Sequence, residues 1–120
     1  MSVRAVRGAV QLLADDREEM HREVAALLAE VLETNSLTID SVISAFFTVT
    51  PDLVSEFPAA AARLAGWTGV PLMCAVEIAV PGSLPRVVRA MIHVETHLER
   101  GQISHIYRGG ARVLRPDLAP

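Results

Sequence analysis

The chain has 120 residues, about half of them apolar, and a formal net charge of −3. This length predicts a single domain over residues 1–120, with enough apolar side chains to bury a core. Aromatic residues are scarce, and every strongly basic residue is an arginine rather than a lysine. The arginines form no block interleaved with aromatic residues, which argues against a nucleic-acid partner.

Cysteine content and hydropathy indicate where the protein works. Cys74 is the only cysteine, so an internal disulfide is excluded and the chain suits a reducing compartment. The N-terminal residues lack the apolar stretch and small-residue cleavage site of a secretory signal. No run of 18 apolar residues could form a membrane-spanning helix. We therefore expect a soluble cytoplasmic protein with no membrane partner.

The first half of the chain predicts a strand, a long helix and a second strand. Alternation and β-branched residues predict a strand over Val3–Val10. Asp15 and Asp16 are suited to cap the next segment, in which apolar residues recur at helical spacing from Asp16 to Asn35. The nearly continuous apolar run Asp40–Thr50 predicts a central strand that is buried on both faces.

The second half predicts a short helix followed by the remaining strands. Pro58 in a first helical turn and Gly66 near the end predict a helix over Phe57–Trp67. Extended segments are expected at Pro71–Val80, Arg86–Thr96, Ile103–Tyr107 and Ala111–Leu114. A tight connection rich in proline and glycine is expected to join the first two of these segments.

These elements add up to an α+β fold, with a mixed five-stranded sheet, one long helix and one short helix. One long helix can cover only one face of such a sheet. The other face needs a cover as well, and self-association is its simplest source.

Three charged residues interrupt segments that otherwise favour burial. Glu77 and Arg89 lie inside the third and fourth predicted strands, and Arg7 lies inside the first. Burying such charges is costly unless they are paired. The residues could be ordinary surface charges at strand ends, or Glu77 could form a structural ion pair with an arginine. They could instead line a pocket for a small anion, since guanidinium groups grip carboxylates bidentately, with Cys74 and Tyr107 as further polar lining.

Two other kinds of site are less well supported by the sequence. A cysteine nucleophile at Cys74 would need His21, His93, His97 or His105 as its base, but no local motif links them, and lone cysteines are usually small buried apolar residues. His93, Glu95 and His97 alternate along one strand face, as metal ligands can, but no second cluster accompanies them. We expect neither a metal nor a cofactor.

Six segments, taken in order, resemble the AroH class of chorismate mutases, the monofunctional bacterial type. They are "VRAVRGAV", "TPDLVSEFPAAAARLAGW", "VPLMCAVEIAV", "GSLPRVVRAMIHVET", "ISHIYR" and "ARVLRPDL". Their order and spacing make the match specific from about Val3 to Leu118. The resemblance implies a homotrimer that forms a pseudo-α/β-barrel, with active sites between subunits. It also implies the isomerisation of chorismate to prephenate in phenylalanine and tyrosine biosynthesis.

The same resemblance implies a set of site residues. Catalytic roles fall on Arg89, Glu77 and Arg7. Substrate-binding positions fall on Tyr107, Cys74, Phe57, Ala59, Arg63, Leu114 and Arg115. Ala60 stands where better-known members have a lysine, which affects one basic contact at the mouth of the cleft.

The arrangement of these residues between subunits is also a prediction. Glu77, Cys74 and Arg89 come from two strands expected to be joined by a tight turn, whereas Arg7 is remote in sequence. We therefore expect Arg7 to lie across the subunit interface from the other three. A Rid-type deaminase, which also binds small carboxylates between subunits, and a non-catalytic trimer that binds chorismate-like anions remain as alternatives.

Overall fold

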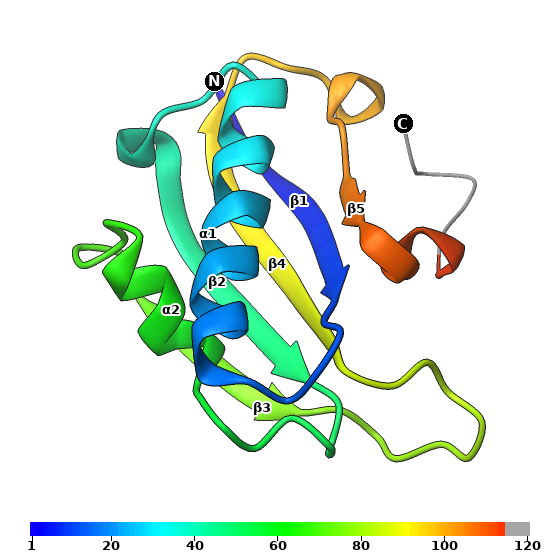
Figure 1. Ribbon diagram of the computed structural model, residues 1–120. Helices are drawn as coiled ribbons and strands as arrows, with labels where there is room; N and C mark the ends of the chain where they lie inside the picture. Colours follow the sequence, from blue (N-terminus) through cyan, green and yellow to red (C-terminus); the bar gives the residue numbers. More distant parts are fainter. Residues whose placement is uncertain (115–120) are drawn as a thin grey trace.

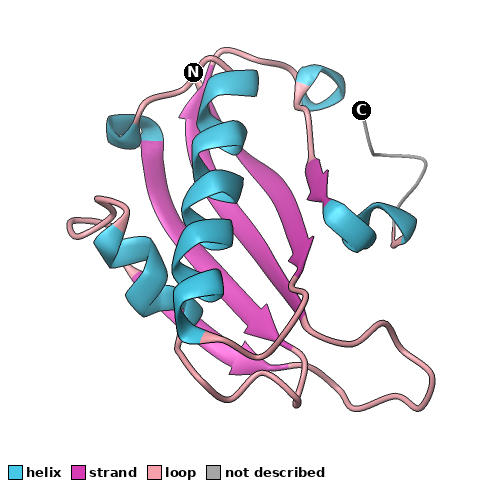
Figure 2. Cartoon of the chain, in the orientation of Figure 1, coloured by secondary structure: helices cyan, strands magenta, loops and turns pink. Residues whose placement is uncertain are grey.

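The computed structural model describes residues 1–114, and it shows one twisted sheet with both helices on the same face (Figures 1 and 2). The strands are β1 (Ser2–Gln11), β2 (Val42–Val49), β3 (Leu72–Val76), β4 (Val87–Thr96) and β5 (Ile106–Arg108). The helices are α1 (Arg17–Thr34) and α2 (Pro58–Leu64). Short 3₁₀ turns occupy Ile39–Ser41, Arg100–Gln102 and Gly109–Val113.

The five strands lie in the order β3-β2-β4-β1-β5. The central strand β4 is antiparallel to both of its neighbours, β1 and β2. The outer strands β3 and β5 pair in parallel with β2 and β1. The expected α+β fold with a mixed five-stranded sheet is confirmed.

The long helix α1 begins and ends where its sequence predicts. The Asp16 side chain caps the helix by accepting a hydrogen bond from the Glu19 backbone N–H, at 2.8 Å. Asn35 ends the helix, and its buried side-chain amide donates to the backbone oxygens of Val31 and Ser104. Within residues 1–114, neither helix is both long and apolar enough to cross a membrane.

The core lies between the helices and one face of the sheet. Apolar residues of α1 at helical spacing, Met20, Val24, Leu27, Leu28 and Val31, are buried there. They pack in one cluster with alternate residues of β1 and β4, including Val6, Val10, Ile92 and Val94. Gly8 of β1 leaves room for this packing, because a Cβ there would stand 3.2 Å from the Leu27 side chain.

The prediction that residues 40–50 form a central strand buried on both faces is wrong. The strand starts at Val42, after a 3₁₀ turn, and lies second from the edge of the sheet. Ala45 and Phe47 face the core, but Phe46 on the other face is 39 % exposed. The apolar run is continuous because one face of the strand packs under the helices and the other belongs to an uncovered apolar sheet face.

The predicted tight connection between the third and fourth strands is also wrong. β3 ends at Val76, and residues 77–86 form a loop that carries the chain past β2 to β4. Apolar residues in this loop, such as Ile78 at 86 % exposed, made it resemble a continuation of the strand.

The C-terminal part differs from the prediction as well. β5 covers Ile106–Arg108, somewhat later than expected, and the segment expected to be extended at 111–114 is instead part of a 3₁₀ turn. Gly109 enters this turn with a positive φ of 57°, which favours glycine. Ala111 is then buried against Tyr107, so the chain turns back onto the sheet rather than adding a strand.

The sheet face away from the helices is largely open and partly apolar. Cross-strand neighbours Phe46 and Met73 lie on it, with Val3 farther along β1, and these side chains are 39 %, 66 % and 59 % exposed. An exposed apolar surface of this kind is typical of an interaction site. The expected self-association remains a prediction, and the exposed apolar residues on this face of the single chain are compatible with it.

Candidate active site

The open face of the sheet brings two of the predicted catalytic arginines together. Arg89 of β4 pairs in register with Ala9, and Arg7 of β1 pairs with Met91, so both side chains stand on the same face. Tyr107 of β5 pairs with Ala9 from the other side and joins them. The three side chains line a cavity of about 210 Å³, together with residues that include Phe46, Thr48 and Met91.

Two polar atoms in this arginine cavity are buried without a hydrogen bond in the part of the chain that the structure describes. They are the Tyr107 hydroxyl and Nε of Arg89. Buried polar atoms in proteins nearly always have a partner. The Tyr107 hydroxyl and the guanidinium groups of Arg7 and Arg89, which line the same cavity, therefore suit an anionic ligand.

Glu77 completes this cluster from the adjoining edge of the sheet. Its backbone N–H donates to the Val49 oxygen at 2.9 Å, which extends the β2–β3 ladder by one residue. Its Oε1 accepts a 2.6 Å hydrogen bond from the Thr48 hydroxyl. The same oxygen lies 2.8 Å from Arg89 Nε. The two groups form a close ion pair, but the N–H of Arg89 is not aligned with the oxygen as a hydrogen bond requires.

Arg7 is held by a contact between its backbone and a histidine. Its N–H donates to Nδ1 of His105 at 2.9 Å, just before β5 begins. This bond fixes the strand at the residue whose side chain enters the cavity, and it gives His105 a structural role.

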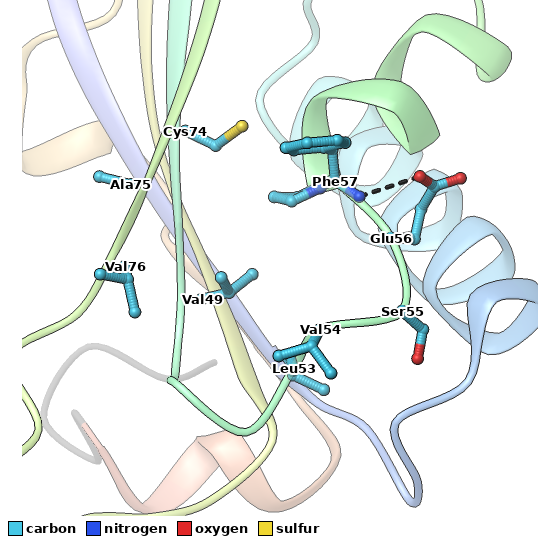
Figure 3. Close-up of a pocket in the computed structure, with 10 residues that line it drawn as sticks. Val49, Leu53, Val54, Ser55, Glu56, Phe57, Cys74, Ala75 and Val76 are labelled. Atoms are coloured by element: carbon cyan, nitrogen blue, oxygen red, sulfur yellow. Dashed lines mark hydrogen bonds between the residues drawn. The ribbon is translucent and has the colours of Figure 1, made fainter.

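Cys74 and Phe57 lie together, but on the other side of the sheet. Cys74 pairs in register with Phe47, which is buried beneath the helices, so its side chain faces the helix layer. It lines a cavity of about 320 Å³ with Phe57 and the segment before it, and Figure 3 shows its sulfur pointing toward the Phe57 ring. The second cavity and the arginine cavity therefore lie on opposite faces of the sheet.

The remaining predicted residues are dispersed. Ala59 is buried in the first turn of α2, and Arg63 is exposed farther along the same helix; neither lines either cavity. Leu114 packs beside Tyr107. Arg115 lies outside the described residues.

The expectation that Arg7 lies across an interface from Arg89 is wrong, because both line one cavity in a single chain. Strand order explains the error. The first strand pairs directly with β4 despite the long stretch of sequence between them. The predicted site residues that lie apart within one chain are instead Cys74 and Phe57, whose cavity is on the opposite face of the sheet from the arginine cavity.

Sequence reasoning missed Thr48, which lines the arginine cavity and binds Glu77. The available signal was a single hydroxyl in the run "AFFTV". The interpretation of that run as buried on both faces concealed the fact that alternate residues face the arginines.

The segment that carries Phe57 is anchored to the start of α1 by two carboxylates. Asp15 accepts hydrogen bonds from the backbone N–H groups of Val54 and Ser55 and from the Ser55 hydroxyl. The Ser55 hydroxyl is the main cause that lowers the pKa of Asp15 below its ordinary value. The wall of the second cavity is thereby tied to the core helix.

Glu56 makes the second anchor. Its Oε2 lies 2.6 Å from Nε2 of His21 and 3.1 Å from Nε of Arg17, and its Oε1 accepts from the Phe57 N–H. The hydrogen bond to His21, and then that from the Phe57 backbone, hold the pKa of Glu56 below its ordinary value.

The geometry gives little support to the other kinds of site. No histidine is among the described residues that line the cavity of Cys74, so a nucleophile–base pair is not assembled there. Within residues 1–114, no group of three or more His, Cys, Asp or Glu side chains is placed to hold a metal ion.

An α+β domain that gathers arginines, a tyrosine and a carboxylate on an open sheet face has the chemical groups of a protein that binds small carboxylates. The family model described as "Chorismate mutase type I" matches residues 3–118, and the chain belongs to this family.

Named relatives agree over nearly the full length. The chain is 43 % identical over 117 residues to "Chorismate mutase AroH" of Thermus thermophilus, covering 97 % of this chain and 96 % of the relative. It is 38 % identical over 120 residues to "Chorismate mutase AroH" of Bacillus subtilis, covering 99 % and 94 %. A solved chorismate mutase from Clostridium thermocellum matches with a TM-score of 0.88 and 47 % identity, over 91 % of this chain and 97 % of that one.

The Glu56 anchor predicts a specific acid dependence of stability. Because its pKa is lowered from an ordinary value of 4.5, ionised Glu56 stabilises the fold above that value, and the contribution is lost as the pH falls through the lowered pKa. Glu56→Gln should reduce the free energy of unfolding by on the order of 1 kcal/mol at pH 7. The deficit should shrink below pH 4.5, as measured by urea titration at several pH values.

Glu23→Gln is the matched control. Glu23 lies on α1, the helix to which Glu56 is anchored, and it forms an ion pair of 3.4 Å with Arg22 at the surface. The substitution should cost little at any pH. A deficit for Glu56→Gln that stays the same from neutral to acid pH would show that its charge does not anchor the loop.

Proposed function

We propose that this chain is a chorismate mutase, which isomerises chorismate to prephenate in the route to phenylalanine and tyrosine. We further propose that it acts as a cytoplasmic homotrimer with shared active sites. The observation that carries the proposal is the arginine cavity, which holds the side chains of Arg7 and Arg89 and the buried Tyr107 hydroxyl, without a hydrogen bond among the described residues, in a chain of the type I family. A dianionic substrate would satisfy those donors.

The reaction is a [3,3] rearrangement within one molecule, in which a C–O bond breaks as a C–C bond forms. It needs no covalent intermediate, proton transfer, metal or cofactor. The enzyme has to hold a flexible dianion in a compact, chair-like conformation, and it has to stabilise the charge that develops in the transition state.

Arg7 and Tyr107 perform the first task in this proposal. They stand on neighbouring strands and line the same cavity, so a guanidinium and a hydroxyl can together hold the side-chain carboxylate of chorismate. Arg63 and Arg115 would favour the ring carboxylate near the mouth of the cleft. Holding the reactive geometry in advance lowers the entropic part of the barrier.

Arg89 and Glu77 perform the second task. Negative charge builds on the ether oxygen as its bond to the ring breaks, and Arg89 stabilises that charge more than it stabilises the substrate. The ring becomes relatively positive, and the Glu77 carboxylate complements it while accepting a hydrogen bond from the ring hydroxyl. These two groups already lie 2.8 Å apart without a ligand, so the ligand would bind beside the ion pair and contact both groups.

The second wall of the site is assigned to a neighbouring subunit. Cys74 and Phe57 line a cavity on the helix side of the sheet, and in this proposal a neighbour that packs on the open face brings its own copies of them to the arginine cavity. Cys74 would then contact the ring hydroxyl as a polar group, and Phe57, Ala59 and Leu114 would shape the apolar part.

The direct test is the loss of chorismate absorbance when purified protein is added, with prephenate identified as the product. Turnover of an enamine or imine substrate in place of chorismate would instead indicate the deaminase alternative. Saturable binding of chorismate without any turnover would indicate a regulatory protein.

Removing the charge of Arg89 should nearly abolish turnover. Loss of one oxyanion donor costs about 10²–10³ in rate, and Arg89→Ala should lower kcat at least this much while the protein stays folded by circular dichroism. Arg89→Lys should also fail, because an ammonium group cannot replace the guanidinium fork. A variant that kept more than about a tenth of kcat would conflict with the role of Arg89.

The rate should depend little on pH. The rearrangement transfers no proton, so no acid–base pair should shape the rate, and kcat should be nearly flat from about pH 5.5 to 9. The solvent isotope effect on the chemical step should be close to unity. A bell-shaped profile around neutrality would instead indicate an acid–base pair and refute the electrostatic mechanism.

Mixing inactive variants should reveal how subunits share the site. Light scattering should first give a mass near three chains. Arg89→Ala chains keep an intact Cys74–Phe57 wall, and Cys74→Arg chains, with that wall blocked, keep an intact arginine cavity. Mixed trimers should therefore contain some complete clefts and regain activity.

A mixture of Arg89→Ala with Arg7→Ala is the matched control. Both residues line one cavity of a single chain, so no cleft in that mixture has both, and activity should not return. Recovery of activity in the control mixture alone would show that Arg7 and Arg89 serve one cleft from different chains. A fully active monomer would refute a site shared between subunits.

A further inference from the structure

Thr48 makes the shortest contact to the carboxylate on which the proposed mechanism depends. Its hydroxyl donates to Glu77 Oε1 at 2.6 Å, and the residue lines the arginine cavity. The hydrogen bond joins neighbouring strands, because Thr48 lies on β2 and Glu77 directly follows β3.

Glu77 has limited support from the backbone around it. Its N–H bond to Val49 is the last step of the β2–β3 ladder, and the chain then leaves the sheet as an exposed loop in which Ile78 is 86 % exposed. A side chain at the junction of a strand and a loop keeps its rotamers unless another group restricts them. The Thr48 hydroxyl restricts it from the neighbouring strand, together with the Arg89 guanidinium.

The hydroxyl also determines how Glu77 meets Arg89. Oε1 is shared between the Thr48 hydroxyl and Arg89 Nε, and the contact of 2.8 Å with Nε is not an aligned hydrogen bond. A carboxylate free to rotate would favour the bidentate arrangement with the guanidinium group. That arrangement would occupy the donors of Arg89 and withdraw Glu77 from a ligand.

We propose that Thr48 is a positioning residue, which holds Glu77 through Oε1 so that Oε2 is left to the substrate and the Arg89 guanidinium stays directed into the cavity. The proposal rests on the function proposed above. It assigns to Thr48 no direct contact with the reacting atoms.

Thr48→Val is the sharpest test, since it preserves the shape of the side chain and removes only the hydroxyl. Loss of a hydrogen bond to a charged group should lower kcat about tenfold to a hundredfold. KM for chorismate should change less than about threefold, because the interactions affected belong mainly to the transition state. Thr48→Ser, which restores the hydroxyl, should return kcat to within about threefold of wild type.

Ser44→Ala is the matched control. Ser44 lies on the same strand and the same face, and its hydroxyl stands 3.5 Å from Nδ1 of His93 rather than in the arginine cavity. Its removal should leave kcat within about twofold of wild type. If Thr48→Val does not fold, Thr48→Ala serves as the second variant, with the same rescue by serine.

A double-mutant cycle separates positioning from a general effect on the strand. In the Glu77→Ala background, Thr48→Val should change kcat by less than about twofold, because the partner of the hydroxyl is gone. The idea is overturned if Thr48→Val keeps wild-type kcat, if serine fails to rescue, or if the two substitutions act independently.

A crystal structure of the Thr48→Val protein tests the structural part without any turnover. Glu77 should swing toward a bidentate contact with Arg89, and an unmoved carboxylate would contradict the proposal. Wild-type protein that fails to convert chorismate would refute the function, while this structure would still decide whether Thr48 holds Glu77.

Discussion

The strand β4 is paired along both of its edges, to β1 on one side and β2 on the other. Its residues alternate between a core under the helices and an open face, so Val88, Ala90, Ile92 and Val94 are buried while Arg89 turns outward. Because every other strand aligns on β4 directly or through one neighbour, its register fixes which side chains meet on the open face. A slip of one residue would exchange the buried and open faces of the strand.

The placement of both helices on one side has a direct electrostatic consequence. A guanidinium group beneath α1 would need a complete set of partners to offset its desolvation. On the open face, Arg89 keeps part of its solvation while its Nε faces the Glu77 carboxylate, and the buried Tyr107 hydroxyl has no hydrogen-bond partner among the described residues. The apolar surface around them, with Phe46 and Met73, suits a second chain, which would lower the local dielectric and strengthen these charges.

The edge strand β3 connects the two halves of the site. Alternation sends Cys74 to the helix side, whereas Glu77, just past the end of the strand, turns to the open face and reaches Thr48 and Arg89. One short segment thus sends Cys74 and Glu77 to opposite faces of the sheet. The shared site proposed above would use both faces, and the anchoring of Phe57 by Glu56 and Asp15 holds the wall beside Cys74 in a defined position.

The sequence by itself determined the α+β class, the long helix with its Asp16 and Asn35 ends, and the charged residues that do not fit a core. Local signals suffice for these features, since capping, helical periodicity and the cost of burying charge all act over a few residues. Resemblance to a family added the site residues and the reaction. The ends of β3 and the conformation of residues 111–114 could not be predicted, because exposed apolar residues such as Ile78 imitate a strand.

Only the tertiary structure decided which of these residues meet. Strand order places Arg7 beside Arg89 across a long stretch of sequence, separates β3 from β4 by β2, and puts Cys74 on the opposite face from the arginines. It also brings the Thr48 hydroxyl to Glu77. Pairing between strands depends on packing of the whole sheet against the helices, and no local pattern encodes that choice, so the sequence could predict neither the geometry of the site nor the part that Thr48 plays in it.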